Sequence, residues 1–253
     1  MAKNTKSIPE QELLQGLKNP LNRRSFLQYT GAGVAASALL LAGCDDDDDI
    51  TDTNTTGSVN LGTGDTGILN YAYALEQLEA AFYSMVVTHA SFQSTFSNAT
   101  ERSVLMDIRD HEVAHREFFK SVLGNSAIPA LTPNFSAVNF ADRTSVLMTA
   151  RTFEDLGVAA YNGAGKLLTS ATNLTLAGKI VSVEARHAAE IREMVKVNTF
   201  AARGATPAIG QETIITGGTA NGGLDMALLP SQVLPLAQPF IRETINASNL
   251  PTI

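Results

Sequence analysis

The chain has 253 residues, of which 44% are hydrophobic and 17% are charged, and its 25 acidic residues outnumber its 18 basic ones. The formal net charge of −7 and the lack of a basic stripe in the sequence argue against a nucleic-acid partner. A single cysteine excludes a framework of internal disulfide bonds.

Residues 1–43 have the features of an export signal, which would be removed from the mature protein. The segment NRRSFLQ carries Arg23 and Arg24 and resembles a twin-arginine signal, with the basic start of a general secretory signal as the alternative. The apolar run Gly31–Gly43 has 13 residues, which is shorter than the ~20 residues of a membrane-spanning helix. We therefore expect export through the twin-arginine route.

A lipid anchor is predicted where this signal ends. The sequence LAGC ends at Cys44 and resembles a bacterial lipoprotein cleavage box, so the only cysteine stands where a lipid would be attached. We expect this N-terminal lipid to hold the protein on the membrane of the cell envelope, at the periplasmic side or the cell surface. Residues 44–65 are rich in Asp, Thr, Asn and Gly, which predicts an acidic flexible tether; a sorting signal and a weak cation site are the alternatives.

Residues 66–204 show helical periodicity and hardly any alternating strand pattern. Asp65 or Thr66 is expected to cap the first helix, and Gly124 and Gly204 stand where the second and fourth helices should end. The expected helices cover residues 68–87, 99–123, 142–170 and 174–203. Four helices of this length predict an all-α bundle.

The connections indicate how the bundle is wound. The first and last connections are short, near residues 92–98 and Asn173, whereas the middle one is long and contains Pro129 and Pro133. One long crossover between the second and third helices is typical of ferritin-like four-helix bundles rather than of simple up-down-up-down bundles. Residues 205–253 are predicted to form a C-terminal extension that packs on the bundle and holds one or two short helices.

Three glycines in the third helix oppose this assignment. Gly157, Gly163 and Gly165 each cost roughly 1 kcal/mol relative to alanine in a helix interior. We expect a close approach of another segment, or space needed beside a site, to compensate.

Two Glu-x-x-His pairs carry the chemistry of the sequence. Glu112 and His115 form one pair, and Glu184 and His187 form the other, although the chain has only 4 histidines. Residues three apart on a helix share one face, about 5–6 Å apart, so a carboxylate and an imidazole can bind one ion.

The first and third helices supply matching carboxylates. EQLEAAFY aligns without gaps on EDLGVAAY, which pairs Glu76 with Glu154 and Tyr83 with Tyr161, while Glu112 pairs with Glu184 in the second and fourth helices. The chain thus consists of two helix pairs, each giving one Glu and one Glu-x-x-His. Four carboxylates balance the charge of two divalent ions, and this donor set suits iron or manganese. The predicted ligands are Glu76, Glu112, His115, Glu154, Glu184 and His187.

Nearby residues have open roles. Glu79 lies one turn after Glu76 and is an alternative ligand from the first helix, and Glu190 is either a further ligand or a solvated side chain. Tyr83 and Tyr161 are expected to be buried rings whose hydroxyls bond ligand carboxylates. His111 is expected to be a surface or hydrogen-bonded residue.

The segments LEQLEAAFY, HEVAHREF, FEDLGVAAYNGA and VEARHAAEIRE resemble a bacterial ferritin-like domain family related to plant desiccation-related proteins and similar to ferritins and rubrerythrins. The resemblance covers about residues 66–203 and includes all six ligand positions. It implies a ferritin-like fold but does not name a reaction.

Two functions follow as hypotheses. The favoured one is a dinuclear iron or manganese protein that reacts with O₂ or peroxide, in ferroxidase-like or peroxide-detoxifying chemistry. The alternative is a lipid-anchored structural or stress-protective protein without catalytic turnover, in which any metal only stabilises the fold.

Overall fold

The computed structural model describes residues 57–200 and 224–252. The chain divides after Thr53 into two units, and all described residues belong to the second one. The predicted export residues Arg23 and Arg24, the lipidation residue Cys44 and residues 205–223 of the extension lie outside the described ranges. Within those ranges, no helix combines the length and the apolar character that crossing a bilayer requires.

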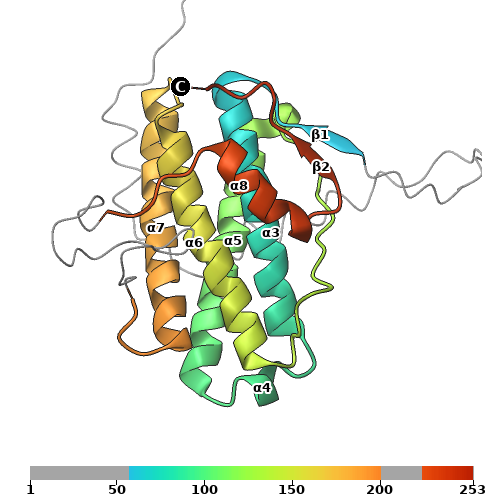
Figure 1. Cartoon of the computed structure of the whole chain (residues 1–253), viewed down its shortest axis with the longest axis vertical. Helices are drawn as coiled ribbons and strands as arrows, with labels where there is room; N and C mark the ends of the chain where they lie inside the picture. Colours follow the sequence, from blue (N-terminus) through green and yellow to red (C-terminus); the bar gives the residue numbers. More distant parts are fainter. Residues whose placement is uncertain (1–56, 201–223, 253) are drawn as a thin grey trace, which may run out of the picture. The chain divides into compact units, whose positions relative to one another are not determined.

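Four long helices run side by side (Figure 1). They pair in chain order, the first with the second and the third with the fourth. Their bounds are α3 Gly64–Thr88, α5 Ala99–Leu123, α6 Arg143–Gly165 and α7 Ala171–Val195. The short helix α4, Phe92–Thr95, lies in the first connection, and the 3-10 helix η2, Gly124–Ser126, opens the long crossover. The predicted all-α bundle is confirmed.

Local capping explains the ends of α5. The Asn98 side chain accepts a hydrogen bond from the Thr100 N–H at the first turn, which satisfies one of the donors that a helix start leaves free. Gly124 follows the last turn with a φ of 52°, a conformation that glycine adopts without a steric penalty. Both bounds of this helix match the sequence prediction.

The sequence predicted Asp65 or Thr66 as the cap of the first helix, but Asp65 does not cap it. Its carboxylate accepts hydrogen bonds from the backbone N–H groups of Thr169 and Ser170 and from the Asn173 side chain. These donors, led by the Thr169 N–H, lower the pKa of Asp65 to about 2. Asp65 therefore ties the start of α3 to the α6–α7 connection, and Thr63 is the residue that precedes α3.

The third and fourth helices are shorter than predicted. Helix α6 ends at Gly165 instead of residue 170, and α7 ends at Val195 instead of residue 203. After α7 the chain turns through Asn198, which has a positive φ of 65°. The Glu193 carboxylate accepts bonds from the N–H groups that follow, including those of Asn198 and Thr199, so a turn replaces further helical bonds.

Residues 58–63, which the sequence placed in the flexible tether, belong to the folded unit. Strand β1, Ser58–Asn60, pairs in parallel with β2, Thr244–Asn246, near the C-terminal end of the chain. The side chains of Val59 and Leu61 alternate inward and are buried, which explains why this segment is held. The C-terminal extension also contains helix α8, Pro230–Ala237, and the 3-10 helix η3, Gln238–Phe240.

Buried amides on α3 hold the crossover, which runs along the bundle in Figure 1. Asn70 donates to the carbonyls of Leu61 and Ser126 and accepts from the Ile128 N–H. Gln77, two turns after Asn70 on the same helix, accepts a hydrogen bond from the Leu131 N–H. These side chains satisfy backbone groups of the crossover that would otherwise be buried without partners.

Gly163 shows why one glycine of α6 is required. The Leu228 N–H donates to the Ala159 carbonyl at 2.9 Å, so the segment before α8 lies directly on α6. A Cβ at position 163 would stand 1.8 Å from the Leu228 carbonyl oxygen, which is backbone and cannot rotate away. The close approach expected from the sequence therefore exists.

Gly163→Ala is expected to destabilise the protein by at least ~1–3 kcal/mol, because the Leu228 segment must leave its place on α6. Chemical denaturation measures this loss. Gly178→Ala in α7 is the matched control, since no atom lies within 4 Å of its Cβ. It should stabilise the protein by up to about 1 kcal/mol through helix propensity. Equal effects of the two changes would contradict this account.

Candidate metal centre

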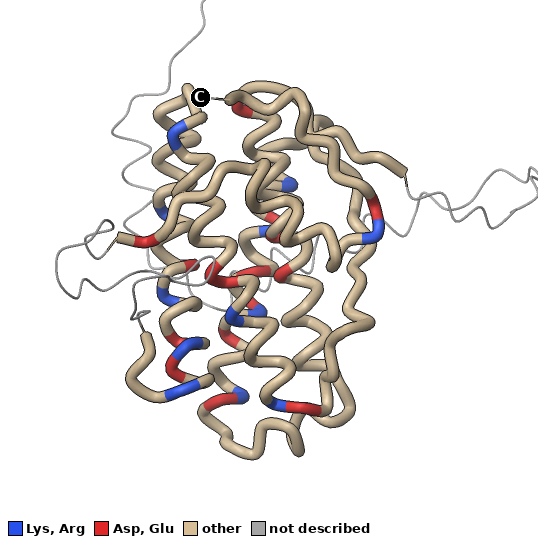
Figure 2. Tube along the Cα trace, in the orientation of Figure 1, with Lys and Arg blue, Asp and Glu red and all other residues tan. Residues whose placement is uncertain are grey.

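The six predicted ligands meet in the interior of the bundle. Helix α3 contributes Glu76 and α6 contributes Glu154, while α5 and α7 each contribute one Glu-x-x-His pair. All four carboxylates are 0% exposed. Figure 2 shows acidic positions from several helices about halfway along the bundle. Buried carboxylates cost several kcal/mol each unless an opposite charge accompanies them, so this cluster requires compensation.

The ligand atoms form two overlapping groups. Within each group one atom from every residue lies within 4.8 Å of the others. The first group is Glu76, Glu112, His115 and Glu184, and the second is Glu112, Glu154, Glu184 and His187. Glu112 and Glu184 belong to both groups. Each group could hold a metal ion, and Glu112 and Glu184 would contribute to both groups.

The imidazoles lie close to the carboxylates. His115 Nδ1 is 2.9 Å from Glu184 Oε1 and 3.4 Å from Glu76 Oε2. His187 Nδ1 is 2.8 Å from Glu112 Oε1 and 3.6 Å from Glu154 Oε2. Each of these ring nitrogens therefore faces carboxylates from two other helices.

The hydrogen bonds within the cluster provide a test of whether these residues fit metal ions. Tyr161 donates to Glu76 Oε1, and Tyr83 donates to Glu154 Oε1 at 2.5 Å. Among the described residues, the other atoms of the cluster that could bind a metal make no hydrogen bond of acceptable geometry, although the ring nitrogens lie close to carboxylate oxygens. These atoms are Glu76 Oε2, Glu154 Oε2, both oxygens of Glu112 and Glu184, and Nδ1 of His115 and His187.

The distribution of these atoms matches the two groups. Glu112 and Glu184, which belong to both groups, have two unbonded oxygens each. Glu76 and Glu154, which belong to one group each, keep one unbonded oxygen and use the other to accept from a tyrosine. Native proteins rarely leave buried polar atoms without partners, so a cation is the missing partner that this arrangement fits.

The sequence comparison agrees with this geometry. Residues 64–197 match the family model of the ferritin-like domain. The chain belongs to the ferritin-like family. A search of curated proteins found no match. The ferritin-like domain spans the four long helices and contains all six of the predicted ligands.

When no metal is bound, protons on side chains of the cluster compensate the negative charge of its carboxylates. Burial opposes a charged imidazole, but the carboxylates around His115 raise its pKa to about 12, and those around His187 raise its pKa to about 11. Burial also acts to raise the pKa of Glu112, yet both imidazoles lower it to about 2. Burial and neighbouring carboxylates raise the pKa of Glu184 well above its usual value. Protons thus occupy the place of a cation.

Glu79 lies beside this cluster without belonging to either group. Burial and four neighbouring carboxylates raise its pKa well above the usual value. A Cβ on Gly157 would stand 3.1 Å from Glu79 Oε1 and 3.6 Å from Glu184 Oε2. Gly157 therefore leaves space for the Glu79 carboxylate, which is the second reason for a glycine in α6. The internal alignment contained this signal, since Glu79 and Gly157 are paired positions.

Glu190 belongs to neither ligand group, and of the two roles left open for it the structure favours the solvated side chain. It is exposed and lines a surface pocket of about 250 Å³ together with His111 and His187. His111 Nδ1 lies 2.8 Å from His187 Nε2, and the two rings stack with centroids 5.1 Å apart. His111 is thus a hydrogen-bonded residue, and it fixes the ring that also faces the carboxylates.

An ion pair next to the site was missed by the sequence analysis. Asp155 follows Glu154 on α6 and lies 2.6 Å from the Arg192 guanidinium of α7, with both side chains buried. Burial raises the pKa of Asp155 to about 7, although Arg192 acts in the opposite direction. The pair joins α6 to α7 beside the cluster. Periodicity alone gave no signal for it, because an Asp and an Arg 37 positions apart are ordinary surface residues in most helices.

Proposed function

We propose that the protein binds two iron or manganese ions in this cluster and uses them in ferroxidase-like or peroxide-detoxifying chemistry. The observation that carries the proposal is a match between the two ligand groups and the atoms that make no well-aligned hydrogen bond. Glu112 and Glu184, which belong to both groups, have two such oxygens each, whereas Glu76 and Glu154, which belong to one group each, have one. A cluster that served only for packing would bury four carboxylates against two imidazoles at a large desolvation cost and gain nothing from it.

The residues of the chain would perform distinct tasks. Glu112 and Glu184 would hold both ions together, and Tyr83 and Tyr161 would orient the terminal carboxylates through their hydrogen bonds. Burial of the cluster excludes bulk water from it. Reduction of hydrogen peroxide to two water molecules takes two electrons and two protons, and a pair of bound ions would supply the electrons.

The proposed place of action is the cell envelope. Arg23 and Arg24 support export through the twin-arginine route, and Cys44 supports attachment to the membrane through a lipid. The twin-arginine route carries folded proteins, which suits a protein that acquires its metal in the cytoplasm. The acidic residues that follow Cys44 would separate the ferritin-like domain from the lipid.

The test is the metal content of the protein from Asp45 onward after anaerobic loading with Fe(II) or Mn(II), measured by inductively coupled plasma mass spectrometry. We expect about two ions per chain, and a sharp loss in His115→Ala and in His187→Ala. His89→Ala is the control, because His89 stacks on Phe140 outside the cluster. Full metal content in both site variants would refute the assignment. A loaded protein that turns over neither Fe(II) with O₂ nor peroxide would favour the structural, stress-protective role.

A further inference from the structure

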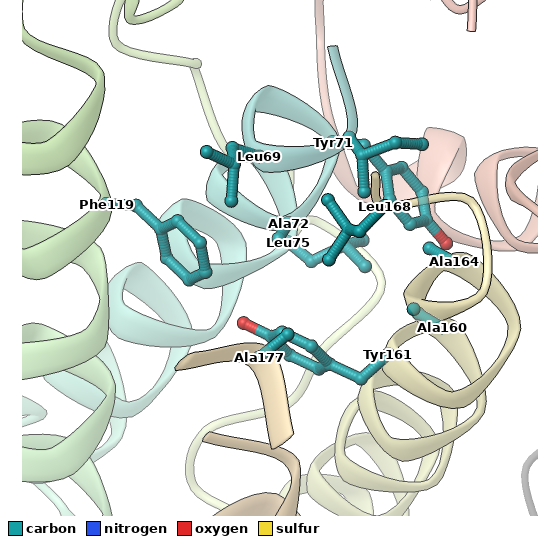
Figure 3. Close-up of a pocket in the computed structure, with 12 residues that line it drawn as sticks. Leu69, Tyr71, Ala72, Leu75, Phe119, Ala160, Tyr161, Ala164, Leu168 and Ala177 are labelled. Carbon is teal, nitrogen blue, oxygen red and sulfur yellow. The ribbon is translucent and has the colours of Figure 1, made fainter. Parts of the chain in front are cut away.

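An apolar pocket lies between α3 and α6 on one side of the cluster (Figure 3). The surface that its wall exposes is apolar, although two of the lining residues are tyrosines, and its volume, counted as the space open to the centre of a water-sized molecule, is about 20 Å³. One small molecule needs ~10–15 Å³ on this measure. The lining includes Tyr71, Leu75, Phe119, Ala160, Tyr161 and Leu168. The pocket therefore has room for a single small guest.

The pocket adjoins the candidate metal centre. Tyr161 lines it, and the hydroxyl of the same ring donates to Glu76. Leu75, another lining residue, directly precedes Glu76 on α3. Figure 3 shows the Tyr161 ring across the pocket from Leu75. Phe119 lies beside the same ring, with centroids 6.4 Å apart. A guest in the pocket would thus be one side chain away from the carboxylates.

Small residues on one half of the bundle create this space. The register that pairs Glu154 with Glu76 and Glu184 with Glu112 also pairs each lining residue with a position in the other half. Four small lining residues have larger counterparts there: Ala160 pairs with Phe82, Ala164 with Val86, Gly165 with Val87, and Ala177 with Leu105. Phe82, Val86 and Leu105 are all buried. Larger side chains thus stand at these four counterpart positions in the other half of the bundle, which we call the filled half.

The pocket also reaches towards solvent. Leu69, Leu168 and Ala177 line it and are only half-buried, so a guest can enter between side chains of α3, α6 and α7. Movement of such side chains on the picosecond to nanosecond scale is enough to admit a diatomic molecule.

We propose that this pocket holds dioxygen next to the metal centre. An apolar cavity favours apolar guests, because a guest with hydrogen-bond donors would lose its bonds to water and find no polar surface on the wall. Hydrogen peroxide carries two such donors, whereas dioxygen carries none. The proposal rests on the proposed function, and within it selects dioxygen over peroxide as the molecule that arrives by this route.

The test uses metal-free protein, so that it does not depend on metal loading. Dissolved dioxygen is paramagnetic and broadens the NMR signals of methyl groups near it. We expect several-fold stronger broadening for the methyl groups of Leu75 and Ala160 than for those of Val86 and Leu105, which are equally part of the core but lie in the filled half. Xenon, an apolar guest of similar size, should shift the same pocket signals.

Variants that copy the filled half should close the pocket. Ala164→Val and, separately, Ala177→Leu introduce the residues already present at Val86 and Leu105, and each should abolish the selective broadening. Ala114→Val on the exposed face of α5 is the control and should leave it unchanged. Circular dichroism checks that each variant folds. If one of the two variants does not fold, the other still tests the pocket.

Equal broadening in both halves, or broadening that survives both filling variants, would overturn the assignment of the pocket. Metal content is measured separately and decides the proposed function. Selective broadening in a protein that binds no metal would overturn the proposed function and keep the pocket as a dioxygen site. Two bound ions without selective broadening would overturn the pocket alone.

Discussion

Glu112→Ala is expected to remove both metal ions from the protein. Glu112 belongs to both ligand groups and has two unbonded oxygens, so its loss takes one ligand from each ion and the bridge between them. Even residues that only support metal ligands change affinity 10–100-fold, so we expect a loss of more than 100-fold here. Glu76→Ala affects one group only, and this variant should retain about one ion per chain.

Competition titrations with a chelating dye and elemental analysis measure both variants. Glu117→Ala is the matched control, because Glu117 lies on the same helix as Glu112 but is exposed. It should bind as many ions as the unchanged protein. If Glu112→Ala and Glu76→Ala each kept one ion, Glu112 would not be a bridge, and the two groups would represent independent sites.

Metal affinity is expected to fall steeply as the pH decreases. The surrounding carboxylates raise the pKa of His115 to about 12 and that of His187 to about 11 in the metal-free protein, against the effect of burial, so both imidazoles carry a proton at pH 7. A metal ion binds only the neutral form, and its binding must release at least these two protons. Lower pH favours the protonated, metal-free state. The association constant should therefore change by about 100-fold or more per pH unit near pH 7.

Titration with Mn(II) at pH 6 to 8 gives this slope, and a weakly buffered solution with an indicator dye reports the released protons directly. The burial of Glu184 raises its pKa well above the usual value and should add to the release. His111→Gln is a useful comparison, because it changes the partner of His187 Nε2 but leaves the carboxylates in place. Binding that is independent of pH over this range would show that the imidazoles are not ligands.

Periodicity and pairing in the sequence predicted much of this protein. The four helices, the long crossover and the end of α5 at Gly124 follow from local signals that the structure keeps. The repeat of Glu76 and Tyr83 in Glu154 and Tyr161 located the carboxylates and the tyrosines that bond them. These predictions succeeded because each depends on residues of one helix or on the comparison of two helices.

Features that depend on contacts between distant segments escaped prediction. The pairing of β1 with β2 joins residues near 59 and 245, and three-residue strands have no periodicity of their own. Helix α7 stops at Val195 because Glu193 bonds the following backbone, a local competition that helical periodicity does not register. The buried pair of Asp155 and Arg192 likewise depends on how α6 faces α7.

The complementarity of Glu79 and Gly157 bears on how the two helix pairs are related. A symmetric dimer of identical helix pairs would carry the same residue at both positions. A glutamate at both positions would crowd the centre, since even a Cβ at 157 would stand 3.1 Å from Glu79 Oε1, and a glycine at both would provide no extra carboxylate. One chain that contains both copies can keep a large residue in the first and a small one in the second. The covalent link through the crossover therefore allows one extra carboxylate at a centre whose other residues are duplicated.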